Sequence, residues 1–188
     1  MSSISPDTHS FEPVDVLLIE DDPQHREQIR TAFEQIETDR NVRLHTADSE
    51  NEAMSFLHPQ DGAQSTTRPD LLLLDLTVPD RHGSSLLESI TDDDALRPLP
   101  VLVLADSESS ADVVRCYDAN ANAYLTKPTS DDKFATFVEA IVCFWVEEAL
   151  LLPRQRDIHP DSTGGELFPS LFVGCSHRSP RNVTSSPP

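Results

Sequence analysis

The sequence predicts an α/β fold: a doubly wound sheet of five parallel strands with helices on both faces. Five short apolar runs lie along the 188-residue chain, and each is followed by a segment whose apolar residues recur every three or four positions. Short continuous apolar runs are typical of strands buried on both faces of a parallel sheet, and the three-four spacing is typical of helices with one buried stripe. Five such units in succession imply right-handed crossovers, which place helices on both faces.

The first strand follows an arm without hydrophobic period. Residues 1–13 are rich in Ser, Pro and Asp, so we expect them to be disordered. Residues 16–19 form the first expected strand, with order beginning near Val14. Asp22 is suited to cap the first helix, because its carboxylate can accept backbone N–H groups, and Pro23 is suited to the first helical position, where no donor is needed. The expected buried stripe of this helix is Ile29, Ala32, Phe33 and Ile36.

The remaining elements repeat this alternation. Residues 42–46 are expected to form the second strand, and Ser49 with Glu52 to form a capping box before the second helix. Residues 58–69 are polar and form a loop, and residues 71–75, the most apolar run, form the third strand. The other expected elements are a third helix around 86–90, a fourth strand at 101–104, a fourth helix around 113–117, a fifth strand at 123–125 and a fifth helix around 134–145.

The C-terminal segment differs from the rest in composition. Of its 36 residues, 153–188, 17 are Ser, Thr, Pro or Gly, which predicts a flexible Ser/Pro-rich tail. Residues 14–152 are therefore expected to form one folded domain. The tail is too short and too irregular for a second domain such as a helix-turn-helix.

The charge of the chain disfavours several kinds of partner. The formal net charge is −19, and such a field repels nucleic-acid phosphates and anionic membranes. No apolar run approaches the ~20 residues that a membrane-spanning helix needs, and the N-terminus lacks the basic and apolar parts of a secretory signal, so we expect a cytoplasmic protein. Only two residues are Lys and 20 of the 33 acids are Asp, a bias that resembles halophilic, haloarchaeal proteins adapted to molar salt.

Acidic residues and one lysine follow the ends of the expected strands. Glu20 and Asp21 come directly after the first strand, Asp75 ends the third, Asp106 comes after the fourth and Lys127 after the fifth. Because the carboxyl ends of parallel strands meet at one edge of the sheet, these side chains are expected to converge. Carboxylates so close together repel one another unless a cation lies between them, and Mg²⁺ prefers oxygen ligands of this kind. The pattern favours Mg²⁺-assisted phosphoryl chemistry.

These motifs resemble the receiver domains of response regulators in two-component signalling, and single-domain receivers in particular. The resemblance covers residues 14 to about 150 and implies a flavodoxin-like sheet with strand order 2-1-3-4-5. Residues 73–79, Leu-Leu-Asp-Leu-Thr-Val-Pro, with Gly83 beyond them, are similar to the phosphoacceptor loop of the family. The other matching positions are the acidic pair Glu20 and Asp21, the aromatic switch position Tyr124 and the turn at Lys127 and Pro128.

The resemblance implies a role for each of these residues. Asp75 would accept a phosphoryl group from the phosphohistidine of a sensor histidine kinase, while Lys127 would offset the developing charge. Mg²⁺ would be held by Asp21, Asp75 and the backbone carbonyl of Thr77, with Glu20 acting through a metal-bound water. No organic cofactor is implied. The chain would not be an enzyme, but a phosphoacceptor that assists its own phosphorylation and dephosphorylation.

One position departs from the family. Where receivers have Thr or Ser at the end of the fourth strand, this chain has Ala105, which offers no hydroxyl to a phosphoryl group. Asp106 comes next, and its charge would repel that group. Ser107 could lend its hydroxyl to the phosphoryl group if the loop bends, but we expect it to cap the fourth helix. These residues favour a second hypothesis, a pseudo-receiver that binds its partner whether or not Asp75 is phosphorylated, whereas the intact acidic pocket argues against it.

Three other classes of phosphate-handling protein fit less well. A haloacid-dehalogenase-type phosphatase needs a second Asp two residues after its nucleophile, where this chain has Thr77. A P-loop nucleotidase needs a Gly-Lys-Ser/Thr loop, and a flavodoxin needs a hydroxyl-rich loop after its first strand. This chain has Glu-Asp-Asp after its first strand and only five glycines in all, which argues against a P-loop nucleotidase and against a flavodoxin.

Partners are expected because no output domain is expected. A stand-alone response regulator would pass its signal to a downstream protein by contact, or pass its phosphoryl group to a phosphotransfer protein. The fifth helix offers a surface, since its last turns are apolar nearly all round and need a second cover. The tail, a kinase or a second copy could supply that cover, and we expect a homodimer. The apolar residues beyond the buried stripe are Val142, Phe144, Val146, Ala149, Leu150, Leu151 and Leu152.

Overall fold

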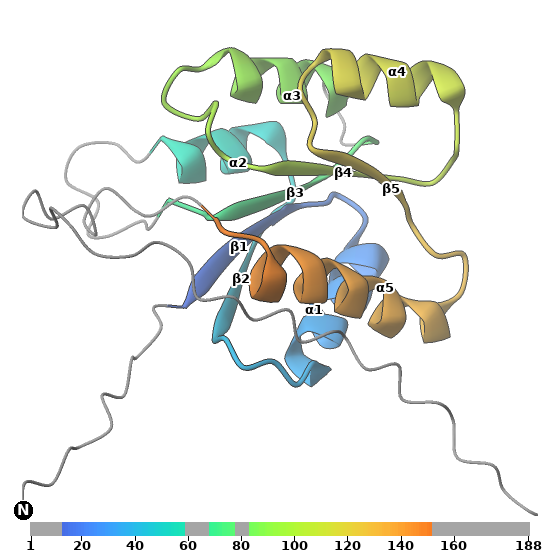
Figure 1. The fold of residues 1–188 in the computed structure, drawn as a ribbon. Coiled ribbons are helices and arrows are strands. Elements are labelled where there is room, and N and C mark those ends of the chain that lie inside the picture. Colours follow the sequence, from blue (N-terminus) through green and yellow to red (C-terminus); the bar gives the residue numbers. More distant parts are fainter. Residues whose placement is uncertain (1–12, 59–67, 78–82, 152–188) are drawn as a thin grey trace, which may run out of the picture. The chain divides into compact units, whose positions relative to one another are not determined.

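The computed structural model describes residues 13–58, 68–77 and 83–151, and these residues form the expected α/β fold (Figure 1). Five parallel strands lie in the order β2-β1-β3-β4-β5, which confirms the doubly wound, flavodoxin-like order 2-1-3-4-5. The predicted arm apart from Pro13, the predicted tail at 153–188 and most of the loop at 58–69 lie outside the described residues.

The elements alternate along the chain as the sequence predicts. The strands are β1 (Val14–Ile19), β2 (Val42–Ala47), β3 (Leu71–Asp75), β4 (Val101–Ala105) and β5 (Ala123–Thr126). The helices are α1 (Pro23–Gln35), α2 (Glu50–Leu57), α3 (Gly83–Asp92), α4 (Ser110–Asp118) and α5 (Phe134–Ile141). A 3-10 turn, η1 (Asp131–Lys133), precedes α5, and π-helical turns, η2 (Val142–Glu148), continue it. No described helix has the length and apolar character needed to cross a bilayer.

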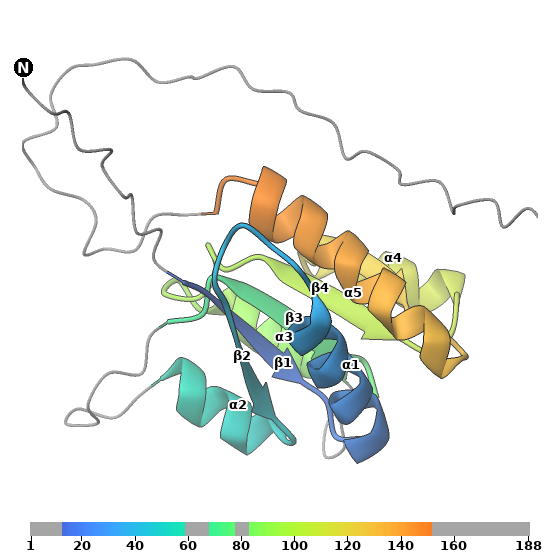
Figure 2. The same cartoon turned by 90° about the horizontal axis from the view of Figure 1, so that it is seen from below.

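One layer of helices covers each face of the sheet (Figures 1 and 2). Alternate residues of a strand point to opposite faces. In β1, Leu17 and Ile19 pack with residues of α2, α3 and α4, whereas Val16 and Leu18 pack with residues of α1 and α5. Every residue of β1, β3 and β4 is buried. Full burial of one Leu or Ile side chain stabilises the fold by about 1.5–3 kcal/mol. These three strands therefore hold the residues that follow them in fixed positions.

Side-chain caps begin the first two helices where the sequence predicts them. Asp22 accepts the backbone N–H groups of Gln24 at 2.7 Å and His25 at 3.4 Å. The bond from Gln24 is the main reason that the pKa of Asp22 is below its usual value. Ser49 accepts the N–H of Glu52 at 3.4 Å. Each cap satisfies a donor that the first turn of a helix leaves without an intrahelical acceptor.

The expectation that Ser107 caps the fourth helix is wrong. The cap is Ser109, whose hydroxyl accepts the backbone N–H of Asp112 at 3.4 Å. β4 continues to Ala105, one residue further than expected, and residues 106–109 form the β4–α4 loop. Ser107 therefore lies in that loop, with its backbone carbonyl available to another partner.

The end of the fifth helix is only partly covered. Val142 and Val146 are buried, but the side chains of Phe144 and Leu150 are 57% and 97% exposed. Phe144 packs edge-on against Trp145, with ring centroids 5.2 Å apart. The homodimer expected at this helix stays a prediction. The exposure of Phe144 and Leu150 is the observation that supports it.

A buried carboxylate ties the start of β1 to β2. Asp15 is fully buried, and its side chain pairs with Arg43 at 2.7 Å and with His45 at 2.8 Å, both on β2. The backbone N–H of Asp15 donates to the carboxylate of Asp70 at 2.8 Å. Breaking such a buried ion pair leaves an uncompensated charge, so these contacts hold the amino end of the sheet in register.

A residue with positive φ ends the turn after α4, and it supplies a test of the fold. Asn120 has φ 62° and is exposed, and its backbone N–H donates to the carbonyl of Tyr117 at 3.0 Å. Gly adopts this conformation without strain, whereas a β-branched residue does not. Asn120→Gly should leave the free energy of unfolding in urea nearly unchanged, and Asn120→Val should lower it by about 1–2 kcal/mol. Equal stability of the two variants would contradict the assigned backbone conformation.

Candidate functional site

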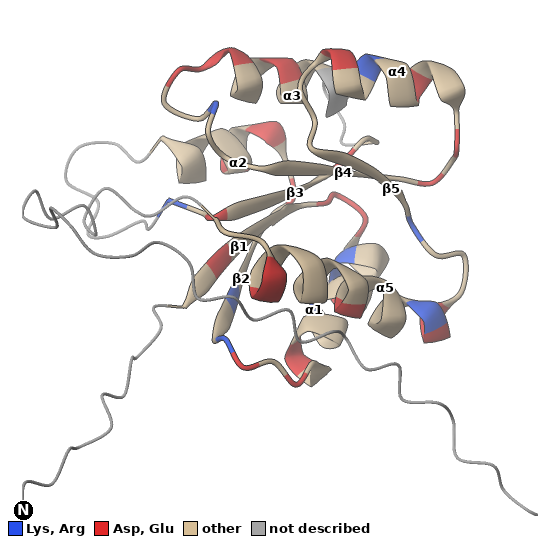
Figure 3. Cartoon of the chain, viewed as in Figure 1, with Lys and Arg blue, Asp and Glu red and all other residues tan. Residues whose placement is uncertain are grey.

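The charged residues that follow the strands converge at the carboxyl edge of the sheet (Figure 3). Glu20 directly follows β1, and the register of β1 with β3 sets it at the level of Asp75. The backbone N–H of Lys127 donates to the carbonyl of Ala105 at 2.7 Å, which holds the residue after β5 against the end of β4. The structure thus brings Glu20, Asp75 and Lys127 together, as the strand ends predict.

The ammonium group of Lys127 is the centre of this cluster. Its Nζ lies 3.1 Å from Oδ1 of Asp75, 3.3 Å from Oε2 of Glu20 and 3.2 Å from Oδ1 of Asp106. The side chain of Lys127 is only 1% exposed. Burial by itself lowers the pKa of Lys127, but the charges of Asp75 and Glu20 outweigh it and raise the pKa above its usual value. The ammonium is therefore charged at neutral pH.

The carboxyl group of Glu20 is fully buried beside that of Asp75. Burial, and next the charge of Asp75, raise the pKa of Glu20 from 4.5 to about 7, although Lys127 acts in the opposite direction. One ammonium thus does not fully compensate the carboxylates around it. The site has residual negative charge that a bound cation would neutralise.

Thr77 holds the second oxygen of Asp75. Its hydroxyl donates a short hydrogen bond to Oδ2 of Asp75, while Oδ1 faces Lys127. Asp75 is fully buried, so these two contacts fix the plane of its carboxylate. The role of the Thr77 backbone carbonyl as a metal ligand stays a prediction.

Three of the acids fit a divalent cation. Glu20, Asp21 and Asp75 each offer one carboxylate oxygen, and these oxygens lie within 4.8 Å of one another. Mg²⁺ takes oxygen ligands at about 2.0–2.1 Å and keeps several waters, so two or three carboxylates at this spacing suit it. Asp21 is only partly buried, which leaves room for water on that side.

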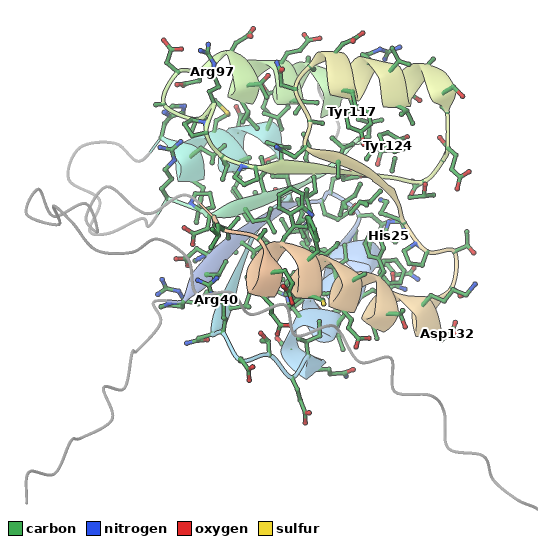
Figure 4. The ribbon with its side chains drawn as sticks, in the orientation of Figure 1. His25, Arg40, Arg97, Tyr117, Tyr124 and Asp132 are labelled. Carbon is green, nitrogen blue, oxygen red and sulfur yellow. The ribbon has the colours of Figure 1, made fainter. Side chains whose placement is uncertain are left out.

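His25 is a member of the cluster that the sequence analysis missed. Its Nδ1 lies 3.2 Å from Nζ of Lys127 and 3.9 Å from Oε1 of Glu20, and its ring lies 6.0 Å from that of Phe134. Figure 4 shows the His25 side chain on the α1 and α5 side of the sheet. The signal for it was present: His25 lies three residues after the predicted cap Asp22, in the first turn of a helix that starts at the site.

The end of β4 differs from the family pattern in the way that the sequence predicts. Ala105 is buried and offers only a methyl group, and Asp106 pairs with Lys127 rather than pointing away. The hydroxyl of Tyr124, the expected switch residue, donates to the backbone carbonyl of Ser107 at 2.8 Å (Figure 4). Tyr124 is therefore tied to the β4–α4 loop.

A hollow of about 370 Å³ lies beside the site, between the ends of β3 and β4 and helix α4. Its lining residues include Leu76, Thr77, Ala105, Asp106, Ser107 and Arg115. The guanidinium of Arg115 lies 3.7 Å from Oδ1 of Asp112 and is about half exposed. The β4–α4 loop thus borders this hollow through Asp106 and Ser107.

Comparison with known proteins gives a family that agrees with this geometry. The model of the response regulator receiver domain matches residues 16–139. The chain is 36% identical over 99 residues to response regulator Rcp1 of Synechocystis sp., a match that covers 53% of this chain and 67% of that protein. It is 33% identical over 135 residues to the probable methanogenesis regulatory protein FilR2 of Methanothrix harundinacea, covering 72% of this chain and 85% of that protein.

Solved structures give the same result. The phosphorylated cyanobacterial phytochrome response regulator RcpA is similar with a TM-score of 0.68 and 30% identity, over 74% of this chain and 98% of that one. The Mn²⁺-bound form of response regulator Rcp1 is similar with a TM-score of 0.68 and 30% identity, over 75% of this chain and 100% of that one. One relative thus carries a phosphoryl group and another a divalent cation.

The raised pKa of Glu20 leads to a pH-dependent stability. A carboxyl group whose pKa is about 7 in the folded protein and about 4.5 when unfolded favours folding below pH 4.5, and this contribution is lost as the pH rises through 7. Without metal, the free energy of unfolding of wild type should fall by on the order of 2 kcal/mol relative to that of Glu20→Gln as the pH rises from 4.5 to 7. Excess Mg²⁺ should reduce this fall. Urea unfolding at a series of pH values, with a chelator or with Mg²⁺, measures it.

The control for this experiment is Glu139→Gln, which removes an exposed carboxylate on α5. Its stability relative to wild type should show little dependence on pH over the same range. A flat difference between wild type and Glu20→Gln would show that Glu20 titrates normally in the folded protein.

Proposed function

Because the chain belongs to the response regulator receiver domain family, we propose that Asp75 accepts a phosphoryl group from the phosphohistidine of a sensor histidine kinase. The observation that carries this proposal is the placement of Asp75, fully buried, with Oδ1 at 3.1 Å from the ammonium of Lys127 and Oδ2 accepting the hydroxyl of Thr77. A carboxylate held in this way is oriented for attack on phosphorus.

The transfer joins one oxygen of Asp75 to phosphorus while the phosphorus–nitrogen bond of the kinase histidine breaks. Lys127 would hold a phosphoryl oxygen and offset the charge that spreads over the transferring group. The same contacts would serve dephosphorylation, in which water attacks phosphorus, the bond from phosphorus to the Asp75 oxygen breaks, and inorganic phosphate leaves. In this sense the chain assists its own phosphorylation and dephosphorylation and acts on no separate substrate.

The proposed metal is Mg²⁺, held by Asp21, Asp75 and the backbone carbonyl of Thr77, with Glu20 acting through a bound water. The cation, when bound, would supply the positive charge that the acidic cluster lacks. The spacing of the three carboxylates and the Mn²⁺ in the structure of the relative Rcp1 support a divalent cation here.

The proposed partners are proteins. One is a sensor histidine kinase. The other is a downstream target protein or a phosphotransfer protein that receives the signal. The formal charge of −19 disfavours contact with nucleic acids and anionic membranes, in line with action in the cytoplasm.

A second copy of the chain is proposed to cover the exposed end of the fifth helix. Phe144 and Leu150 are the apolar side chains that such a contact would bury. Phe144→Glu should lower the mean mass measured by light scattering if the wild type is dimeric, since burying a charge there is unfavourable. Identical masses for wild type and variant would contradict this surface as the dimer contact.

The alternative function is a pseudo-receiver that binds its partner independently of phosphorylation. Two observations favour it: Ala105 has no hydroxyl for a phosphoryl group, and Asp106 occupies one of the positions around Lys127 that such a group would take. The two functions differ in one measurable event, the modification of Asp75.

Intact-mass spectrometry after incubation with Mg²⁺ and acetyl phosphate in molar KCl distinguishes these functions. Wild type should gain one phosphoryl group and Asp75→Asn none, because the amide is not a nucleophile of this kind. Asp94→Asn, which changes a side chain that is 89% exposed near α3, should behave as wild type. Folded wild type that gains no phosphoryl group would support the pseudo-receiver instead.

A further inference from the structure

We propose that Asp106 is a latch on Lys127 that the phosphoryl group displaces, so that phosphorylation releases the β4–α4 loop. The carboxylate of Asp106 holds the ammonium before phosphorylation, and a phosphoryl oxygen on Asp75 takes its place afterwards. This inference rests on the proposed function of Asp75. It assigns a role to a residue at which the sequence indicated only repulsion.

Three carboxylates surround the ammonium of Lys127. One oxygen each from Glu20, Asp75 and Asp106 lies within 3.3 Å of Nζ, and Nδ1 of His25 lies at 3.2 Å. An ammonium has three N–H donors, a number that three carboxylates already match. A phosphoryl oxygen on Asp75 would therefore compete for Lys127 with the carboxylates of Glu20 and Asp106.

Asp106 is the carboxylate that can withdraw at least cost. Glu20 and Asp75 are fully buried, so either of them would be left charged without a partner in the interior. The side chain of Asp106 is 54% exposed and would recover water on leaving. A phosphoryl group also brings roughly −1.5 to −2 charges, which repel Asp106 from the same position.

The hollow beside the site gives Asp106 a place to go. Asp106 and Arg115 both line this space of about 370 Å³. Arg115 is about half exposed and lies 3.7 Å from Asp112, a weak pair that a second carboxylate could join. The loop can thus move away from Lys127 toward a positive charge on α4.

Movement of Asp106 is passed to Tyr124 through the next residue. The backbone carbonyl of Ser107 accepts the hydroxyl of Tyr124 at 2.8 Å, so displacement of the loop changes the environment of that ring. Ala105 has no hydroxyl with which a phosphoryl group could draw the loop inward. In this chain the coupling is therefore repulsive, and the loop is released outward.

The test uses the two tyrosines of the chain, Tyr117 and Tyr124, as ¹⁹F probes. The full chain is labelled with 3-fluorotyrosine, and Tyr117→Phe assigns the two resonances. Spectra are recorded before and after acetyl phosphate with Mg²⁺, while intact mass reports phosphorylation of the same samples. Asp106→Asn keeps the shape of the side chain and removes its charge. Glu108→Gln, an exposed neighbour in the same loop, is the matched control.

In wild type and Glu108→Gln the Tyr124 resonance should move on phosphorylation. In Asp106→Asn it should lie near its phosphorylated position from the start and move little afterwards. Phosphorylation of Asp106→Asn should also be roughly three- to fivefold faster, the effect of losing one partly exposed ion pair. If Asp106→Asn is phosphorylated at the wild-type rate and its Tyr124 resonance behaves as in wild type, the latch is overturned while the proposed function stands.

Failure of the proposed function gives a different result. If neither wild type nor Asp106→Asn takes up a phosphoryl group, both proposals fail. If only Asp106→Asn takes it up, Asp106 blocks phosphorylation of the wild type, and a latch that the phosphoryl group displaces is overturned together with the proposed function of the wild type.

Discussion

A buried ammonium group holds the carboxyl edge of this sheet together. In the part of the chain that the structure describes, Lys127 is the basic side chain that pairs with all three close carboxylates, and two of those carboxylates are removed from water. Each of the three comes from a different strand end, so the ion pairs can form only if the strands finish at the same level. The hydrogen bond from Lys127 to the carbonyl of Ala105 fixes that level for the last two strands. The packing of the apolar strands and the charge cluster thus depend on each other. The packed strands position the charged side chains, and a shift in strand register would leave a buried charge without a partner.

The sequence predicted the parts of the molecule that depend on periodicity and on strand ends. The parallel sheet and the convergence of Glu20, Asp75 and Lys127 follow from apolar runs that end in charged residues, whereas the order of the strands came from the resemblance to receiver domains. The sequence did not predict that His25 lies against Lys127, because the direction of a side chain in the first helical turn depends on packing against Phe134 from a distant helix. Ser109 rather than Ser107 caps α4 because β4 extends to Ala105, and element ends are set by tertiary contacts as much as by local signals.

Asp106 shows the same limit for electrostatics. Read along the chain, it is an acid beside a phosphoacceptor site, and repulsion is the natural expectation. In three dimensions it is also the partner of the nearest cation, so its charge is attracted before any phosphoryl group is present. Before phosphorylation, the attraction between Asp106 and Lys127 decides where the Asp106 side chain lies. The position of Lys127 relative to Asp106 cannot be read from the order of the residues.

The near absence of lysine has a practical consequence. Of the two lysines in the chain, Lys127 is 1% exposed and Lys133, at the start of the fifth helix, is exposed. An amine-reactive dye or cross-linker applied to these 188 residues in their native fold would therefore find one exposed lysine side chain. Conjugation chemistry that usually gives heterogeneous products would give a nearly uniform one here, attached beside the helix whose far end carries Phe144.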